Sequence, residues 1–170
     1  MKKNLVLTGM MGVGKSTIGS ALAKKLKLIF FDIDKIIEKE NSTTIKDIFE
    51  KEGEAKFREI EKKTVFRVLG NKESVIALGG GAFMNPEIRG KIIDKCISIW
   101  LDLDIKLLKE RLLDSKKRPL LNKTNVEKTL TSIYRKRKDI YSLANYRINC
   151  NDVDKKKIIE KILKNVINRN

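Results

Sequence analysis

The sequence predicts an α/β fold in which a parallel sheet is covered by helices on both faces. Three observations predict it. Short apolar runs alternate with amphipathic helical stretches along the whole chain. Acidic or glycine-rich residues directly follow several of these runs. The 170 residues, 41% of them hydrophobic, suffice for the core of one domain spanning residues 1–170. Because crossovers are right-handed, the carboxyl ends of the strands meet at one edge, where ligands bind.

The expected elements follow one another in strand–helix order. The strands are expected at residues 5–8, 28–31, 74–78, 96–101 and 146–150. The helices are expected at about 15–27, 35–69 with breaks near 41–43 and 53, from 85 onward, 105–113, 126–143 and 154–167. The run Leu28-Ile29-Phe30-Phe31 is unbroken, which is typical of a buried parallel strand. The polar segment 115–124 is expected to form a loop.

Composition narrows the class of protein. The chain has no histidine, which excludes a histidine zinc site or a histidine general base. Cys96 and Cys150 both lie in strand-like runs, so buried thiols are expected rather than disulfides. No apolar run approaches the roughly 20 residues that span a bilayer. The apolar run after Lys2-Lys3 is too short for a secretory signal, so a cytoplasmic protein is expected.

The formal net charge of +16 has two explanations. One is a nucleic-acid partner, whose phosphates basic residues neutralise. The other is a lysine-rich surface with a site for anionic substrates. The lysines are scattered over every expected helix, and only ten residues are aromatic. This distribution favours the second explanation.

The strongest motif is the run from Gly9 to Ser16, GMMGVGKS, followed by Thr17. It matches the phosphate-binding loop G-x-x-x-x-G-K-[ST] and has the required strand before it and helix after it. Backbone N–H groups of such a loop surround phosphates, the lysine reaches the β- and γ-phosphates, and the hydroxyl ligates Mg²⁺. The residues expected to bind a nucleotide are Gly12, Val13, Gly14, Lys15, Ser16 and Thr17.

Two strand ends carry further candidates. Asp32 and Asp34 follow the second strand, and in an extended backbone both carboxylates would face the same side. One could hold Mg²⁺, and the other could orient or deprotonate an attacking hydroxyl; the alternative is that Asp34 caps the next helix. Gly79, Gly80 and Gly81 follow the third strand, where positive φ and close backbone approach to a ligand are possible. The alternative there is a flexible turn.

Arginines in this lysine-rich chain supply the fork geometry that binds a carboxylate. Arg58 and Glu61 are spaced to pair on one helix face, although such a pair is more often a surface contact. Arg118, in the loop 115–124, is expected to be a lid residue that stabilises charge on a transferred phosphoryl group. Arg135 and Arg137 are either site residues or part of a solvated basic face. These residues indicate a kinase for a small anionic polyol.

The sequence resembles the shikimate kinases over nearly its whole length. The matching segments are GMMGVGKST at 9–17, FDID at 31–34, IFEKEGEAKFREIE at 48–61, GGG at 79–81, RPLL at 118–121 and RKDIY at 137–141. The resemblance implies a fold like that of nucleoside monophosphate kinases, a three-layer structure with a five-stranded parallel sheet ordered 2-3-1-4-5. It also implies ATP- and Mg²⁺-dependent phosphorylation of the shikimate 3-hydroxyl in aromatic amino-acid biosynthesis, by a monomer with no nucleic-acid or membrane partner.

The resemblance also implies roles for individual residues. Lys15 would bind the ATP phosphates, Ser16 and Asp32 would hold Mg²⁺, and Asp34 would position the attacking hydroxyl. Arg58, Arg137 and the glycines Gly79, Gly80 and Gly81 would hold shikimate. Phe49, Phe57 and Glu61 would line or brace its pocket. The substrate segment would span about 33–61 and the lid about 114–124, from which Arg118 would reach ATP.

The match departs from the family pattern in one place. Family members often have an arginine beside the adenine, in the loop after the fifth strand. Here that loop is Asn151-Asp152-Val153-Asp154. The adenine contact is therefore expected to differ, and base selectivity to be looser.

Overall fold

The computed structural model describes residues 3–71, 73–114, 125–151 and 154–167, and its sheet has the predicted topology. Five parallel strands are ordered β2-β3-β1-β4-β5. They are β1 (Leu5–Thr8), β2 (Ile29–Asp32), β3 (Ser74–Ala77), β4 (Ile97–Asp102) and β5 (Tyr146–Asn149). The three central strands β3, β1 and β4 are buried along their whole length, as expected of a sheet covered on both faces.

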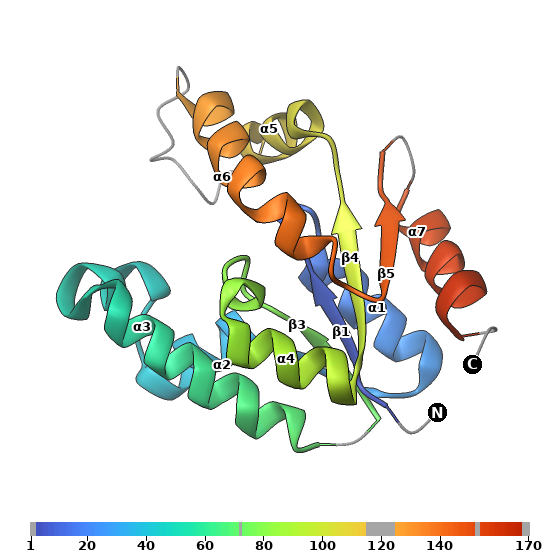
Figure 1. The fold of residues 1–170 in the computed structure, drawn as a ribbon, viewed down its shortest axis with the longest axis horizontal. Helices are drawn as coiled ribbons and strands as arrows, with labels where there is room; N and C mark the ends of the chain where they lie inside the picture. Colours follow the sequence, from blue (N-terminus) through green and yellow to red (C-terminus); the bar gives the residue numbers. More distant parts are fainter. Residues whose placement is uncertain (1–2, 72, 115–124, 152–153, 168–170) are drawn as a thin grey trace.

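The helices form two layers and a group at the carboxyl end of the sheet (Figure 1). They are α1 (Lys15–Leu26), α2 (Ile33–Asn41), α3 (Ile45–Leu69), α4 (Pro86–Lys95), α5 (Ile105–Asp114), α6 (Val126–Tyr141) and α7 (Lys155–Ile162), with short turns at η1 (Ala82–Met84) and η2 (Leu163–Ile167). Helices α1 and α7 pack side by side on one face of the sheet, and α4 with α3 lies on the other. Helices α5 and α6 pack together beyond the carboxyl ends of the strands.

Local signals account for the ends of several helices. Asn85 caps α4 and Pro86 is its first residue, as predicted. Thr44 and Asp47 form a reciprocal capping box at the start of α3. Gly53 has φ 82° and divides α3 at a kink. The predicted breaks near 41–43 and at Gly53 are therefore both confirmed.

One strand differs from its expected environment. The run 28–31 was expected to form a buried strand, but β2 lies at an edge of the sheet and Ile29 is 63% exposed. An apolar run shows that a strand is partly covered, and it does not distinguish a central strand from an edge strand covered by helices. Phe30 faces α1, where it approaches the position that a side chain on Gly19 would take. The end of β2 nevertheless lies near the phosphate loop, since Asp32 and residues of that loop line one pocket.

The two cysteines are buried and free, as predicted. Burial raises the pKa of the Cys96 and Cys150 thiols to about 11. Among the described residues, no helix combines the length and the apolar character needed to cross a membrane.

Candidate active site

The loop between β1 and α1 has the backbone of an anion cradle. Gly9, Gly12 and Gly14 have φ values of 137°, 80° and 100°, which residues with a Cβ rarely adopt. Helix α1 begins at Lys15 without a side-chain cap, so the amides of its first turn remain available to a ligand. The Lys15 ammonium donates hydrogen bonds to the carbonyls of Gly9 and Met10, at 2.8 and 2.9 Å. The predicted nucleotide residues are thus brought together at the start of α1.

Helix α5 supports this loop from the side. A Cβ on Gly12 would lie 3.0 Å from a methyl carbon of Leu112, so the loop and the helix are in close contact. Arg111 Nη1 donates a hydrogen bond to the carbonyl of Val13 at 3.3 Å. Arg111 was not among the site residues predicted from the sequence. The signal was the one used for Arg58, an arginine in a chain whose cations are mostly lysines.

The two aspartates after β2 reach the site by a different geometry from the predicted one. Asp32 ends the strand, but Asp34 lies in the first turn of α2, so the two do not share an extended backbone. Asp32 Oδ1 accepts a hydrogen bond from the Lys35 amide, at 3.3 Å, and is the helix cap. The alternative of a capping Asp34 is therefore wrong. Although the strand ends at Asp32 and a helix begins directly after it, the carboxylates of Asp32 and Asp34 still line the same pocket.

That pocket joins the phosphate loop to the ends of β2 and β3. It has a volume of about 230 Å³, and its lining is Met11, Gly12, Gly14, Lys15, Ser16, Thr17, Asp32, Asp34, Leu78 and Gly80. The Ser16 hydroxyl and the Asp32 carboxylate are hard oxygen ligands of the kind that Mg²⁺ prefers. Two protein ligands in an open pocket leave positions for phosphate oxygens and water, so the residues fit a magnesium ion bound together with a nucleotide.

The three glycines after β3 allow close approach of side chains, without positive φ. None of them has positive φ, so of the two possibilities given for these glycines close approach is the one that the structure shows. A Cβ on Gly79 would lie 2.6 Å from Asp34 Oδ1 and 2.7 Å from Glu61 Oε1. A Cβ on Gly81 would lie 2.7 Å from the Arg58 guanidinium. The loop is glycine-rich because charged side chains of α2 and α3 occupy the space beside it.

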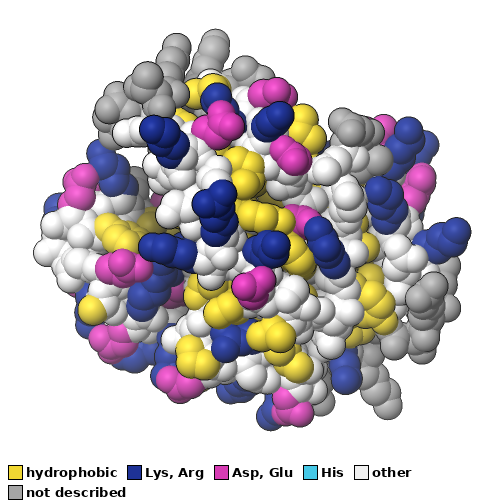
Figure 2. Space-filling view, turned by 45° about the horizontal axis from the view of Figure 1, so that its top comes forward, with side chains coloured by type: hydrophobic (Ala, Val, Ile, Leu, Met, Phe, Trp, Pro, Cys, Tyr) yellow, Lys and Arg dark blue, Asp and Glu magenta, His cyan; other side chains and the backbone are white. Residues whose placement is uncertain are grey.

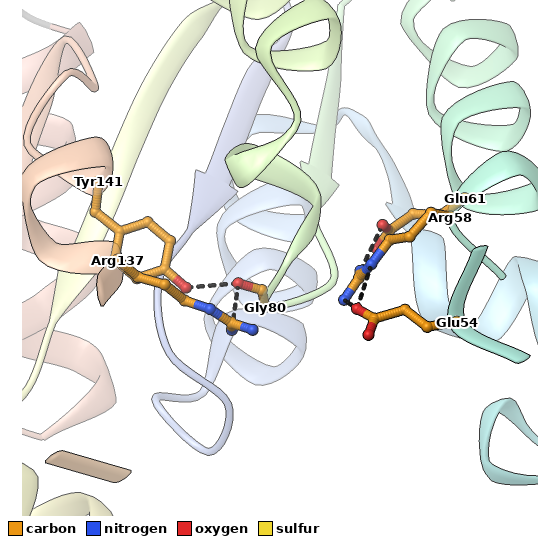
Figure 3. A network of polar contacts seen from close by, with 6 residues as sticks. All are labelled: Glu54, Arg58, Glu61, Gly80, Arg137 and Tyr141. Atoms are coloured by element: carbon orange, nitrogen blue, oxygen red, sulfur yellow. Dashed lines mark hydrogen bonds and ion pairs between the residues drawn. The ribbon is translucent and has the colours of Figure 1, made fainter. Parts of the chain in front are cut away.

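Arg58 lies on one side of this loop and is held by two carboxylates (Figure 3). Its Nη1 donates to Glu61 Oε2 at 2.7 Å, and its Nη2 donates to Glu54 Oε1 at 3.1 Å. The guanidinium carbon is 5.1 Å from the centre of the Phe57 ring, and Phe57 packs against Phe49 with ring centroids 4.6 Å apart. These contacts fix the orientation of a cation that is only partly exposed, with side-chain accessibility of 31%.

Glu61 is a buried carboxylate, and only 2% of its side chain is accessible. Burial raises its pKa above the ordinary value, and Arg58 counteracts this shift in part. The nearby Asp34 carboxylate raises the pKa further. Within the described part of the chain, Oε1 accepts no hydrogen bond. The Arg58–Glu61 pair is therefore not the weak surface contact that spacing alone allowed.

Arg137 lies on the other side of the glycine loop, on α6. Its Nη1 donates to the Gly80 carbonyl at 2.9 Å, and the Tyr141 hydroxyl donates to the same oxygen (Figure 3). Arg135, by contrast, is exposed. Of the two alternatives that the sequence left open, Arg137 is therefore at the candidate site and Arg135 is part of the solvated face. Tyr141 had no predicted role, although its spacing of four residues from Arg137 places both on one helix face.

Two predicted regions lie partly or wholly outside the described residues. Arg118 and the lid residues 115–124 lie outside, as do residues 152–153 of the loop after β5. The flanking residues of that loop have structural contacts: Asn151 Oδ1 accepts a hydrogen bond from the Asp104 amide, and Asp154 caps α7.

The arrangement has two cationic ends with carboxylates between them. The phosphate loop and Lys15 form one end, and Arg58 and Arg137 form the other around Gly80 and Gly81. Asp34 lines the pocket between these ends. Such a site can hold a polyphosphate and a second anion at once, with a carboxylate beside the groups that would react.

Comparisons with known proteins agree with this geometry. A family model described as shikimate kinase matches residues 11–167. The chain is 43% identical to a shikimate kinase of Bradyrhizobium diazoefficiens, covering 95% of this chain and 78% of that protein. It is 40% identical to a shikimate kinase of a Sulfurihydrogenibium species, covering 98% and 99% of the two chains. The structure is similar to that of an Acinetobacter baumannii shikimate kinase in complex with shikimate, with TM-score 0.91, 34% identity and coverage of 98% and 94%.

Proposed function

The chain belongs to the shikimate kinase family and is an ATP-dependent kinase, and from this premise we propose how its own residues act on shikimate. The observation that carries the proposal is the pocket that joins the phosphate loop to Asp34 and Gly80, with Arg137 bound to the Gly80 carbonyl and Arg58 beside Gly81. Lys15 and the amides at the start of α1 bind the ATP phosphates. Ser16 and Asp32 would hold Mg²⁺, which would neutralise charge on the ATP phosphates.

At the other end, Arg58 and Arg137 bind the shikimate carboxylate beside Gly79, Gly80 and Gly81. Glu61 accepts from Nη1 of Arg58 and Glu54 accepts from Nη2, so the two carboxylates fix the orientation of the guanidinium, whose further N–H groups bind the substrate. The rings of Phe49 and Phe57 support the guanidinium from behind. The +16 charge of the chain serves the binding of anionic substrates in this scheme.

Asp34 positions the attacking hydroxyl. The 3-hydroxyl oxygen forms a bond to the γ-phosphorus, while the bond from that phosphorus to the oxygen bridging to the β-phosphate breaks, and ADP leaves. The hydroxyl proton passes to the Asp34 carboxylate or to water. Arg118 stabilises the charge of the transferred group from the lid of about 114–124. Arg111 holds the phosphate loop in place through the Val13 carbonyl.

The protein acts as a monomer in the cytoplasm, as one domain with neither nucleic acid nor membrane as a partner. Figure 2 supports the choice against nucleic acid: on the face shown, lysines and arginines are interspersed with acidic and hydrophobic side chains. A nucleic-acid-binding protein requires a continuous basic patch or stripe. Tight DNA binding at ~150 mM salt would contradict this part of the proposal.

The test is a coupled assay for ADP release with ATP and Mg²⁺. Release is expected with shikimate and not with gluconate or a nucleoside monophosphate, and the opposite pattern would refute the proposed substrate. Asp34→Asn should lower turnover by at least ~10²-fold if the carboxylate accepts the proton. A smaller loss would limit Asp34 to orienting the hydroxyl. Lys15→Ala serves as the inactive control.

A further inference from the structure

Tyr141 is a buried residue at the end of α6 with a contact that the scheme above does not use. Its side chain is fully buried, and its ring packs against Trp100 with centroids 5.9 Å apart. Its hydroxyl donates to the Gly80 carbonyl oxygen, which also accepts from Arg137 Nη1 at 2.9 Å. Burial raises the pKa of this phenol, so the hydroxyl keeps its proton and remains a donor at neutral pH.

Two donors on one carbonyl fix the plane of the peptide bond between Gly80 and Gly81. No peptide bond in the described structure is cis. In a trans peptide the N–H of the second residue points opposite to the carbonyl of the first. The Gly80 carbonyl points toward Arg137 and Tyr141 on α6 (Figure 3). The Gly81 N–H therefore points away from α6, and Arg58 lies beside Gly81 on the other side of the loop. Among the described residues, this N–H has no hydrogen-bond acceptor.

The glycine loop cannot set this orientation by itself. Gly80 and Gly81 are the central residues of a turn closed by the Ala82 N–H on the Gly79 carbonyl at 3.1 Å, and glycine at both positions allows the peptide between them either orientation. The carbonyl could turn into the pocket, where it would repel a bound carboxylate. Arg137 is partly exposed and would share its guanidinium between this carbonyl and the substrate. Tyr141 is fully buried, so its hydroxyl is available to hold the carbonyl turned toward α6.

We propose that Tyr141 is a positioning residue that, through the Gly80 carbonyl, aims the Gly81 N–H at the carboxylate of the acceptor substrate. The inference rests on the proposed function, because it assigns the carboxylate of shikimate to this end of the pocket. Tyr141 touches no reacting atom in this role. It contributes to recognition of the carboxylate and not to phosphoryl transfer itself.

The test is Tyr141→Phe, which keeps the ring packing and removes only the hydroxyl. The KM for shikimate should rise about 3- to 10-fold, the effect of one hydrogen bond, with the KM for ATP and kcat within twofold. The matched control is Tyr134→Phe on the same face of α6, which removes a hydroxyl that donates to Asp102 Oδ1 at 3.1 Å. That variant should leave the KM for shikimate within twofold.

A second substrate separates positioning from general damage to the fold. The methyl ester of shikimate lacks the carboxylate charge, so Tyr141→Phe should change its KM by less than twofold. An unfolded fraction would lower kcat alone, and thermal denaturation measures it directly. An unchanged KM for shikimate, or equal increases for shikimate, its ester and ATP, would overturn the inference while leaving the proposed function intact. Absence of shikimate turnover by the wild-type protein would refute the proposed function and the inference with it.

Discussion

Replacing Glu61 by glutamine separates the contribution of this residue to stability from its contribution to substrate binding. The side chain keeps its size, and the amide oxygen can still accept from Arg58 Nη1, where the carboxylate now accepts at 2.7 Å. The amide nitrogen can donate toward Asp34, since Glu61 Oε1 and Asp34 Oδ1 both lie within 2.7 Å of the same point beside Gly79. The substitution therefore removes a buried charge without leaving a cavity.

The magnitude follows from the bond that is weakened. A hydrogen bond to a charged group contributes roughly 1.5–3 kcal/mol and a neutral one about 0.5–1.5 kcal/mol, so the hold on Arg58 weakens by about 1–1.5 kcal/mol. If that loss falls on the carboxylate of shikimate, its KM rises about 5- to 10-fold, with little change in the KM for ATP. Arg58 is partly exposed and keeps its contact with Glu54. The melting temperature at pH 7 should consequently stay within about 4 °C of wild type.

The pH dependence of stability gives the sharper measurement. The pKa of Glu61 is raised in the folded state, so its protonated form is favoured there, and the folded chain binds this proton more tightly than the unfolded chain. The contribution of Glu61 to stability is full below its unfolded pKa and is lost as pH rises through the folded pKa. Glutamine has no such dependence. In urea unfolding between pH 5 and 8, the variant should gain stability relative to wild type as pH increases.

Two outcomes would refute this reasoning. If the variant lost stability relative to wild type as pH rose, then Arg58 would outweigh burial and would hold the pKa of Glu61 below its ordinary value. If the KM for shikimate were unchanged, then Glu61 would not fix the orientation of Arg58 for the substrate. Groups that do not interact with Glu61 titrate alike in the variant and the wild type, so they do not affect the difference in stability. Only Glu61 and its neighbours Arg58, Asp34 and Arg137 contribute to the pH dependence of that difference.

Three further predictions use the same structure. Gly79→Ala places a Cβ 2.6–2.7 Å from two carboxylate oxygens and should lower the free energy of unfolding by about 1–3 kcal/mol. The control is Gly80→Ala, whose Cβ would have its nearest neighbours at 3.5 Å and which should fold normally. Equal melting temperatures for the two variants would contradict this prediction. Arg137→Ala should raise the KM for shikimate about 10- to 150-fold and the KM for ATP much less, and equal effects would count against its assignment. Cys96 and Cys150, with pKa values of about 11, should react with a thiol reagent at pH 8 only after denaturation, and rapid labelling of the native protein would show that they are accessible.

The alternation of strands and helices and the phosphate loop were predictable from sequence because their signals are local, whereas the strand order came from the resemblance to the shikimate kinases. Apolar runs and helical periodicity define the elements, and the spacing from Gly9 to Ser16 defines the loop. Right-handed crossovers then place all strand ends at one edge. The edge position of β2 was not predictable in this way, because covering helices make an edge strand as apolar as a central one.

The details of the acceptor end depended on contacts between distant segments. Asp32 and Asp34 were expected to share an extended backbone, but α2 begins directly after Asp32, because that residue itself caps the helix. For the glycines at 79–81 the sequence allowed positive φ, close approach to a ligand or a flexible turn. Their actual reason is the space taken by Asp34, Glu61 and Arg58, and no pattern within the glycine run indicates which side chains will approach it.

Three of the described arginines hold backbone oxygens, whereas Arg58, Arg67 and Arg147 pair with carboxylates. Arg89 donates to the carbonyls of Phe83 and Met84, Arg111 to that of Val13, and Arg137 to that of Gly80. A guanidinium can donate from one nitrogen to the protein and from another to a ligand, in a planar geometry that an ammonium lacks. The +16 charge raises the local concentration of any anion. In the proposed scheme, selection of a carboxylate beside a polyphosphate comes instead from Arg58 and Arg137, whose guanidinium groups are held on the two sides of the glycine loop.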